Sequence, residues 1–149
     1  MVWACMAASG VGRLVFIDGI MDAVAYRRIL AENLQQSAEK LGFTGSFYFV
    51  QDNDPKHTAR IVKELFAQRP HIRVFSWPPQ SPDLNPIEHL WDFLGRNINQ
   101  HRISSISELK QTIMEEWQKI SSEVTHKLIA SMPRRIVKVV RRGGRNTKY

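Results

Sequence analysis

The chain has 149 residues, of which 43% are hydrophobic and 23% are charged, a length and composition typical of one globular domain. They exclude a membrane-spanning protein, because no apolar run approaches the roughly 18 residues that a bilayer requires. The sequence also excludes a scaffold stabilised by internal disulfides, because Cys5 is the only cysteine. The single cysteine indicates an intracellular protein.

The net charge of +7 comes from the C-terminal segment. Residues 134–149 contain seven Lys or Arg and no acidic residue, whereas residues 1–133 contain 14 residues of each sign. Such a segment favours a polyanion, because each neutralised phosphate releases condensed counterions. The alternative is a solvated helix end followed by a frayed tail. We therefore divide the chain into a domain at 1–133 and a basic tail at 134–149, with candidate nucleic-acid contacts at Arg134, Arg135, Lys138, Arg141 and Arg142.

The first half of the sequence predicts alternating strands and helices. Residues 2–8 and 13–18 are expected to form two strands of a hairpin. Asp22 is a good N-cap for a helix whose apolar positions recur at helical spacing as far as Leu41, where Gly42 provides a stop. Residues 47–51 and 72–77 predict two further strands. A helix expected between them, from about Thr58, makes these two strands parallel.

The second half predicts helices. Asn85 is a good N-cap and Pro86 a good first residue for a helix that follows a proline-rich turn. Ser105 and Glu108 fit a capping box at the start of another helix. Two shorter helices are expected to follow, the last beginning at Pro133. This order of elements predicts an α/β fold in which helices cover a mixed sheet, with a helical C-terminal flank.

Two carboxylates stand at positions that suit a metal site. Asp52 follows a predicted buried strand, and the ends of such strands border the crevice where α/β sheets bind ligands. Glu88 lies in the first turn of the helix that begins at Pro86, and the connection between the two residues can bring them together. Paired carboxylates bind Mg²⁺, which prefers oxygen ligands. Each also has a structural alternative, an Asx-turn for Asp52 and helix capping for Glu88.

The sequence around these carboxylates is distinctive. The segments QDNDPKHTA (51–59) and WPPQSPDLNPIEHLW (77–91) resemble the two signature blocks of mariner superfamily transposases, in particular of their worm-type Tc branch. The N-terminal block VWACMAASGVGRLVFIDGIMD, the YRRILAENL segment and the closing RNTKY resemble the same proteins in the same order. The resemblance covers essentially the full chain. Its SPDLNPIEHLW block is highly specific, because the proline spacing serves a particular turn.

The resemblance implies a ribonuclease-H-like catalytic core with an Asp-Asp-Glu triad and bound Mg²⁺ or Mn²⁺. Asp52 matches the second Asp of the triad and Glu88 its third carboxylate, so both are implied to be catalytic and metal-binding. The implied reaction is in-line displacement at phosphorus, which excises a transposon and joins it to target DNA. The implied partners are DNA and, in addition, a second copy or a full-length transposase, and the implied location is the nucleus.

The sequence departs from the family at its start. By resemblance, the first Asp of the triad belongs to a strand before the VWACMAA block, and this sequence begins at Met1. We therefore expect a ribonuclease-H-like sheet truncated at the N-terminus, weakened metal binding and no cleavage by the chain alone. The alternative function is a non-catalytic, transposon-derived remnant that binds DNA or a transposase.

Other polar residues could also contribute to the site, and some of them have a structural interpretation as well. Asp18 ends a predicted strand and could replace the absent carboxylate, but its place before Gly19 indicates a turn. Asp54 and Asp83 are interpreted as residues that order turns or loops. Lys56 and His57 lie close enough to Asp52 to contact a phosphate, and a structural role for the histidine stays open.

Overall fold

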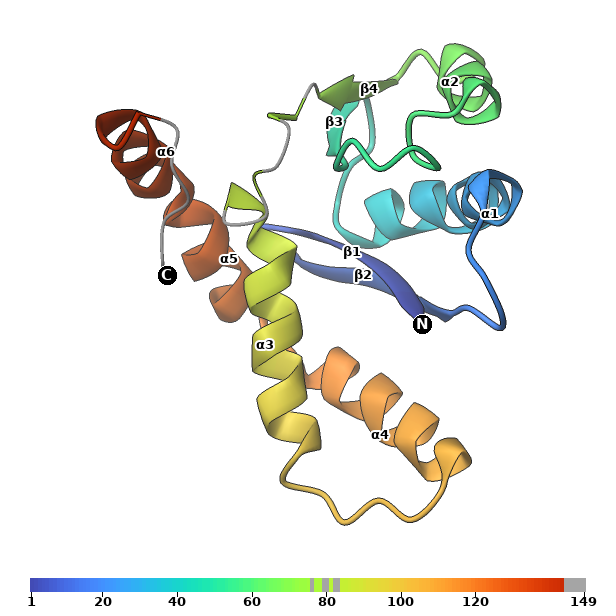
Figure 1. Ribbon diagram of the computed structural model, residues 1–149, viewed down its shortest axis with the longest axis vertical. Coiled ribbons are helices and arrows are strands. Elements are labelled where there is room, and N and C mark those ends of the chain that lie inside the picture. Colours follow the sequence, from blue (N-terminus) through green and yellow to red (C-terminus); the bar gives the residue numbers. More distant parts are fainter. Residues whose placement is uncertain (76, 79–80, 82–83, 144–149) are drawn as a thin grey trace.

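The computed structural model describes residues 1–75, 77–78, 81 and 84–143 (Figure 1). Asp83 in the proline-rich turn, and residues 144–149 with the RNTKY block, lie outside the described residues. The elements follow the predicted order: β1 (Val2–Ala7), β2 (Gly10–Phe16), α1 (Ala23–Lys40), β3 (Phe47–Val50), α2 (Arg60–Ala67), β4 (Ile72–Phe75), α3 (Pro86–Ile98), α4 (Ile106–Lys119), α5 (Ser122–Ala130) and α6 (Met132–Arg141). The proposed boundary between residues 133 and 134 falls inside α6.

The predicted helix starts are confirmed by their caps. The Asp22 carboxylate accepts a hydrogen bond from the backbone N of Ala25 at 2.7 Å, and α1 ends before Gly42, whose φ is 87°. The Ser105 hydroxyl accepts from the backbone N of Glu108 at 3.1 Å. The reciprocal half of the predicted capping box differs, because the Glu108 carboxylate binds the backbone N and the hydroxyl of Ser104, both at 2.8 Å. The neighbouring serine offers this carboxylate two donors.

The strands form two separate pairs. β1 and β2 are antiparallel, with an irregularity between Ala4 and Met6. β3 and β4 are parallel, with Phe47 opposite Ile72, as the intervening helix α2 predicts. Within the described residues, the expected mixed sheet is therefore present as two two-stranded sheets, because no ladder of backbone hydrogen bonds joins one pair to the other.

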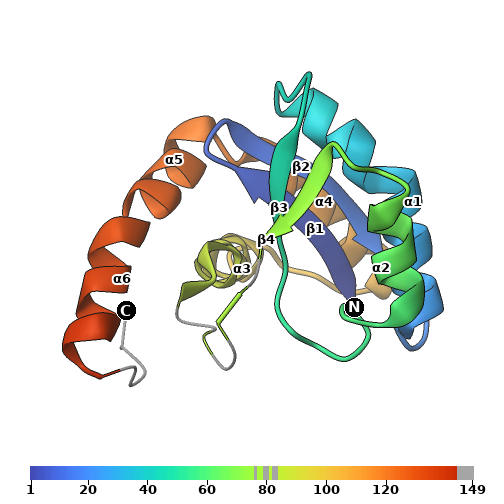
Figure 2. The ribbon, with the colours of Figure 1, turned by 90° about the horizontal axis from the view of Figure 1, so that it is seen from above.

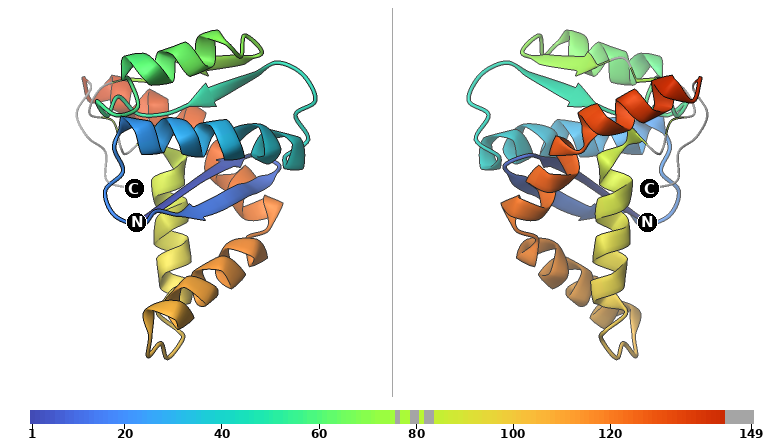
Figure 3. Two further views of the ribbon diagram at one scale, coloured as in Figure 1. Left: turned by 90° about the vertical axis from the view of Figure 1, so that its right-hand side faces the viewer. Right: turned by 90° about the vertical axis from the view of Figure 1, so that its left-hand side faces the viewer.

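Helices lie on both sides of the strands. α1 and α2 cover one side, and α3, α5 and α6 lie on the other (Figures 1 and 2). One buried cluster joins both strand pairs to α1 and α2 and includes Trp3, Tyr26, Leu30, Phe47, Val62 and Ile72. A second cluster joins the hairpin to α3 and α4 and includes Leu14, Leu90, Leu94 and Trp117. The α3–α4 pair extends away from the strands at the lower end of the molecule (Figure 3).

The hairpin approaches its covering helices closely. A Cβ atom at Gly12 would lie 2.5 Å from the Cys5 sulfur and 2.8 Å from the Ser37 Cβ on α1, so this position requires glycine. On the other side, Trp117 Nε1 donates a hydrogen bond to the Gly12 carbonyl at 3.0 Å. In the part of the chain that the structure describes, no helix combines the length and apolarity needed to cross a bilayer.

Candidate metal and nucleic-acid site

Asp52 lies two residues beyond the C-terminal end of β3, and its two carboxylate oxygens have different surroundings. Oδ1 accepts a hydrogen bond from the backbone N of Asp54 at 3.1 Å, which is the Asx-turn contact, and also pairs with Nδ1 of His57. Oδ2 has no hydrogen bond from the described residues. Because the side chain is 55% exposed, Oδ2 is accessible to a ligand from solvent.

His57 is part of a buried network that the sequence did not reveal. Its ring lies 4.0 Å from the ring of Tyr26, measured between centroids, and its side chain is 15% exposed. The Tyr26 hydroxyl donates to Oε1 of Gln51 at 2.7 Å, and Nε2 of Gln51 donates to the His57 carbonyl at 3.1 Å. Burial, and then the nearby charge of Asp52, raise the pKa of the Tyr26 hydroxyl. No pattern in the sequence pairs Tyr26 with Gln51.

The rest of this loop is held by Asp54, as a turn residue. Its carboxylate accepts from the backbone N of Lys56 at 3.0 Å and forms an ion pair with the Lys56 ammonium group. The hydrogen bond from the Lys56 side chain is the largest cause of the lowered pKa of Asp54. Asn53 Nδ2 donates to the Trp77 carbonyl at 2.7 Å, which ties the loop to the segment after β4. Lys56 is therefore engaged within the loop, although its side chain remains partly exposed.

Glu88 occupies the first turn of α3, and its electrostatic surroundings connect it with Asp52. Asn85, the N-cap, donates weakly to Glu88 Oε1 at 3.5 Å. Burial raises the pKa of the Glu88 carboxyl, and the negative charges of Asp52 and Asp92 raise it further. Asp52 and Glu88 are separated by a strand and a helix in the sequence. The fold therefore places the Glu88 carboxyl where the charge of Asp52 affects it.

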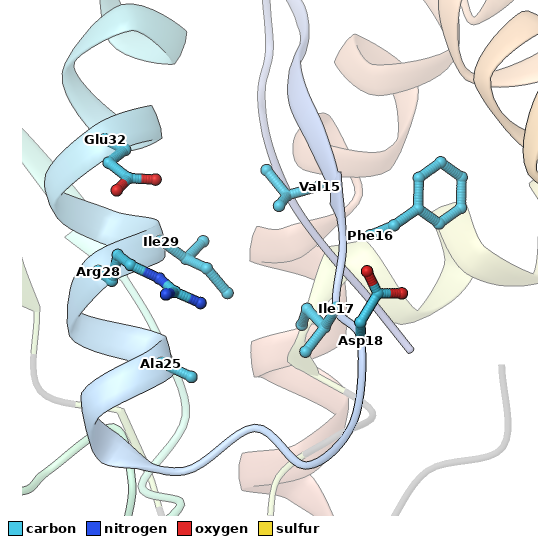
Figure 4. A pocket seen from close by; sticks show the side chains of 8 residues that line it. All are labelled: Val15, Phe16, Ile17, Asp18, Ala25, Arg28, Ile29 and Glu32. Atoms are coloured by element: carbon cyan, nitrogen blue, oxygen red, sulfur yellow. The ribbon is translucent and has the colours of Figure 1, made fainter.

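Asp18 lies in a different environment. Its carboxylate is on the Phe16 side of the strand, turned away from Arg28 and Glu32 on α1 (Figure 4). The Lys110 ammonium group lies 3.3 Å from it, and the Asp18 side chain is 90% exposed. Gly19 follows with a φ of 79°, at a bend of the backbone. The Asp18 carboxylate is thus paired with Lys110, and the pocket that includes it is lined by residues of the segment 15–18 and of α1.

The metal ligands that the sequence predicts are the carboxylates of Asp52 and Glu88. Among the described residues, no group of three or more His, Cys, Asp or Glu side chains could hold a metal ion. The pocket beside Asp52 has a mixed lining. Its polar side chains include Asn53, His57, Thr58 and Lys63, and its apolar ones are Phe66, Ile72, Val74 and Phe75.

The comparison with protein families identifies the domain. The sequence profile of the DDE superfamily endonucleases matches residues 2–110. The chain belongs to this family. Two similar proteins are transposases of nematodes. Over 149 residues, this chain is 43% identical to the Tc1 transposase of Caenorhabditis elegans and 41% identical to the Tcb2 transposase of Caenorhabditis briggsae. Each alignment covers 100% of this chain and 54% of the relative, so the chain spans about half the length of these transposases.

The fold of this DDE domain also matches a solved structure. The catalytic domain of the Mos1 mariner transposase superimposes with a TM-score of 0.86 at 24% sequence identity, covering 99% of this chain and 75% of the Mos1 domain. The same domain has been solved with Mg and with Mn, and both structures match with a TM-score of 0.86. The predicted ribonuclease-H-like α/β fold is thereby confirmed.

The basic residues of the C-terminal segment lie in and just after α6, and they do not form one uniform surface. The side chains of Arg134, Lys138, Arg141 and Arg142 are exposed, as a contact with DNA requires. Arg135 is 5% exposed, and its charge lowers the pKa of His89 on α3, second to the effect of burial. Arg135 on α6 is thus buried, unlike the surface contact expected from the sequence.

Proposed function

We propose that this chain supplies Asp52 and Glu88 as metal-binding carboxylates to the catalytic domain of a DNA transposase, which cleaves DNA and joins the ends to a target. The observation that carries this proposal is that Asp52, just after β3, and Glu88, in the first turn of α3, both lie within the part of the chain that matches the DDE endonucleases. Isolated carboxylates have many roles, but two that repel one another across a fold are stabilised together by a cation.

The side chains present fit a hard divalent cation. Both candidate ligands offer oxygen atoms, and Asp52 Oδ2 has no competing hydrogen bond from the described residues. Mg²⁺ commonly binds through one or two carboxylates, with waters and substrate phosphates completing its six ligands. A bound Mg²⁺ or Mn²⁺ would stabilise the charge that develops on phosphate oxygens during displacement. The Mos1 catalytic domain, which shares this fold, has been solved with each of these metals.

The test is a titration of the 149-residue chain with Mn²⁺, in which free Mn²⁺ is measured by electron paramagnetic resonance. Asp52→Asn and Glu88→Gln should each weaken binding at least about tenfold, because both remove a ligand rather than a supporting group. Asp18→Asn is the matched control, because it removes an exposed carboxylate outside the proposed site, and it should bind Mn²⁺ like the wild type. Unchanged binding by Asp52→Asn would refute the metal site.

A second candidate function is DNA binding through α6 without catalysis, and the four exposed basic residues on this segment favour it. Contacts with phosphates supply affinity without sequence preference. We expect Arg134→Ala with Arg141→Ala to weaken duplex binding and to reduce the slope of log K against log salt by about 0.9 per lost phosphate contact. Lys40→Ala with Arg60→Ala is a charge-matched control elsewhere on the surface and should leave the slope unchanged. Equal slopes for both double variants would exclude α6 as the DNA contact.

The partners in this proposal are transposon-end and target DNA, together with a second copy or a full-length transposase. Mos1 transposase, which has the same fold, forms a paired-end complex. Sedimentation of the chain with and without a transposon-end duplex tests the assembly. We expect a complex that contains two copies of the chain when the duplex is present. We also propose a nuclear location, because the substrate is genomic DNA, and imaging of a fluorescent fusion tests this.

A further inference from the structure

The His57 ring is held in one orientation by contacts on several sides. It lies against the Tyr26 ring, at 4.0 Å between centroids, and Nδ1 faces the Asp52 carboxylate. Its backbone carbonyl accepts a hydrogen bond from Gln51, which itself accepts one from Tyr26. The side chain and backbone of His57 are therefore fixed by the same pair of residues. A ring held in this way can impose a geometry on the group that it binds.

The protonation of this ring follows from its partner. An ionised carboxylate can only accept hydrogen bonds, so Nδ1 of His57 must carry the proton that lies between the two groups. Nε2 is buried and has no hydrogen-bond partner in the described part of the chain. The ring therefore donates in one direction, toward Asp52. Because the exposed fraction of the side chain is 15%, this direction is not readily exchanged for a contact with solvent.

The same contact distinguishes the two oxygens of Asp52. Oδ1 accepts from two donors, Nδ1 of His57 and the backbone N of Asp54 at 3.1 Å. Two donors on one oxygen restrict the rotation of the carboxylate, so Oδ2 is presented in one direction. A metal-binding carboxylate that is itself hydrogen-bonded loses less freedom when it binds the ion.

We propose that His57 is a positioning residue, which orients the Asp52 carboxylate so that Oδ2 binds the divalent cation. This inference rests on the proposed function of Asp52 as a metal ligand. It assigns to His57 a role different from direct contact with phosphate, because the ring is mostly buried and its donor is used on Asp52. Tyr26 and Gln51 hold the histidine in turn.

Two substitutions at this position separate the hydrogen bond from the packing. His57→Phe keeps an aromatic ring against Tyr26 but removes the donor, whereas His57→Asn removes the ring but keeps an N–H donor near the position of Nδ1. If His57 positions Asp52, His57→Phe should weaken Mn²⁺ binding by about tenfold to a hundredfold, and His57→Asn should retain most of the affinity. Circular dichroism and thermal unfolding of each variant verify that it is folded.

Other outcomes overturn the inference. Wild-type affinity in a folded His57→Phe variant would show that the hydrogen bond does not matter, and a loss of affinity confined to His57→Asn would assign His57 a packing role only. If Asp52→Asn leaves Mn²⁺ binding intact, the proposed metal site itself fails, and this result is distinguishable from failure at His57 alone.

A spectroscopic measurement tests the hydrogen bond without any metal. The ¹⁵N chemical shifts of the neutral imidazole report which nitrogen carries the proton. We expect the Nδ1–H form of His57 in the wild type and a shift toward the Nε2–H form in Asp52→Ala. A predominant Nε2–H form in the wild type would overturn the proposed contact, whatever the metal affinity.

Discussion

The hairpin β1–β2 and the parallel pair β3–β4 are both two-stranded, but they are buried to different extents. The hairpin has α1 on one face and α3 and α4 on the other, so residues from both of its faces belong to buried clusters. The β3–β4 pair buries Phe47 and Ile72, while Tyr48 is 66% exposed and Phe75 is 49% exposed. The candidate site lies beyond the end of the less buried pair. The hairpin therefore provides most of the packing, and β3–β4 positions functional groups at lower burial.

Leu90→Ala gives the largest expected effect on the side of the hairpin. Leu90 is fully buried at 0% exposure and belongs to the cluster between α3 and the hairpin. Its truncation should lower the free energy of unfolding by about 2–5 kcal/mol, because it removes apolar contacts and leaves a cavity. Urea denaturation measures this loss. Ile106→Ala, at a side chain that is 76% exposed, is the control and should change stability by less than about 0.5 kcal/mol.

Gly12→Ala tests the close approach of the hairpin to α1. The added Cβ would meet the Cys5 sulfur and the Ser37 side chain, so we expect a loss of about 1–3 kcal/mol in the free energy of unfolding from overpacking. Gly95→Ala in α3 has no atom within 4 Å of its added Cβ and should instead stabilise the protein by about 0.5–1 kcal/mol. Similar effects of both substitutions would contradict the difference in packing.

Glu88→Gln tests the repulsion at the candidate site through its pH dependence. Because the folded protein raises the pKa of Glu88, ionising this carboxyl destabilises the fold. The destabilisation is absent below the unfolded pKa of about 4.3 and develops as the pH rises through the folded pKa. Glu88→Gln should therefore give a small rise in Tm at neutral pH without metal and no difference at acid pH. A difference in Tm that appeared only at acid pH would contradict a raised pKa of Glu88.

Tyr48→Thr on the exposed face of β3 gives the smallest expected effect. Tyr48 contacts the Phe75 ring edge-on, at 6.5 Å between centroids, and is otherwise largely open to solvent. Threonine, like tyrosine, is well suited to a strand, so the change in the free energy of unfolding should be about 0.5 kcal/mol or less. A loss as large as that of Leu90→Ala would show that this face is covered in solution and would erase the contrast with the hairpin.

Local structure was predictable wherever neighbouring residues determine it. The N-caps at Asp22 and Ser105 were recognisable because a cap needs only a side-chain oxygen beside the first turn. The parallel pairing of β3 with β4 followed from the helix between them. The Glu108 carboxylate binds Ser104 instead of the expected backbone N–H of Ser105, because Ser104 offers both a backbone N–H and a hydroxyl.

The candidate site was predictable in part, through the motif rather than through geometry. Asp52 and Glu88 were identified from their signature blocks, and their roles as metal ligands stay a prediction. The network of Tyr26, Gln51 and His57 was not foreseen, because its members come from different elements and the spacing between them carries no signal. Arg135 was grouped with its basic neighbours, since charge alone does not show which face of a helix is buried.

By itself, the sequence determined the order of helices and strands, the family and the two candidate carboxylates, because these depend on periodicity, caps and contiguous motifs. The pairing of His57 with Asp52, the effect of the Asp52 charge on Glu88 and the burial of Arg135 became known only from the tertiary structure. These facts depend on how separate elements pack together. Packing is set by the whole set of buried contacts, which no single segment of the chain encodes.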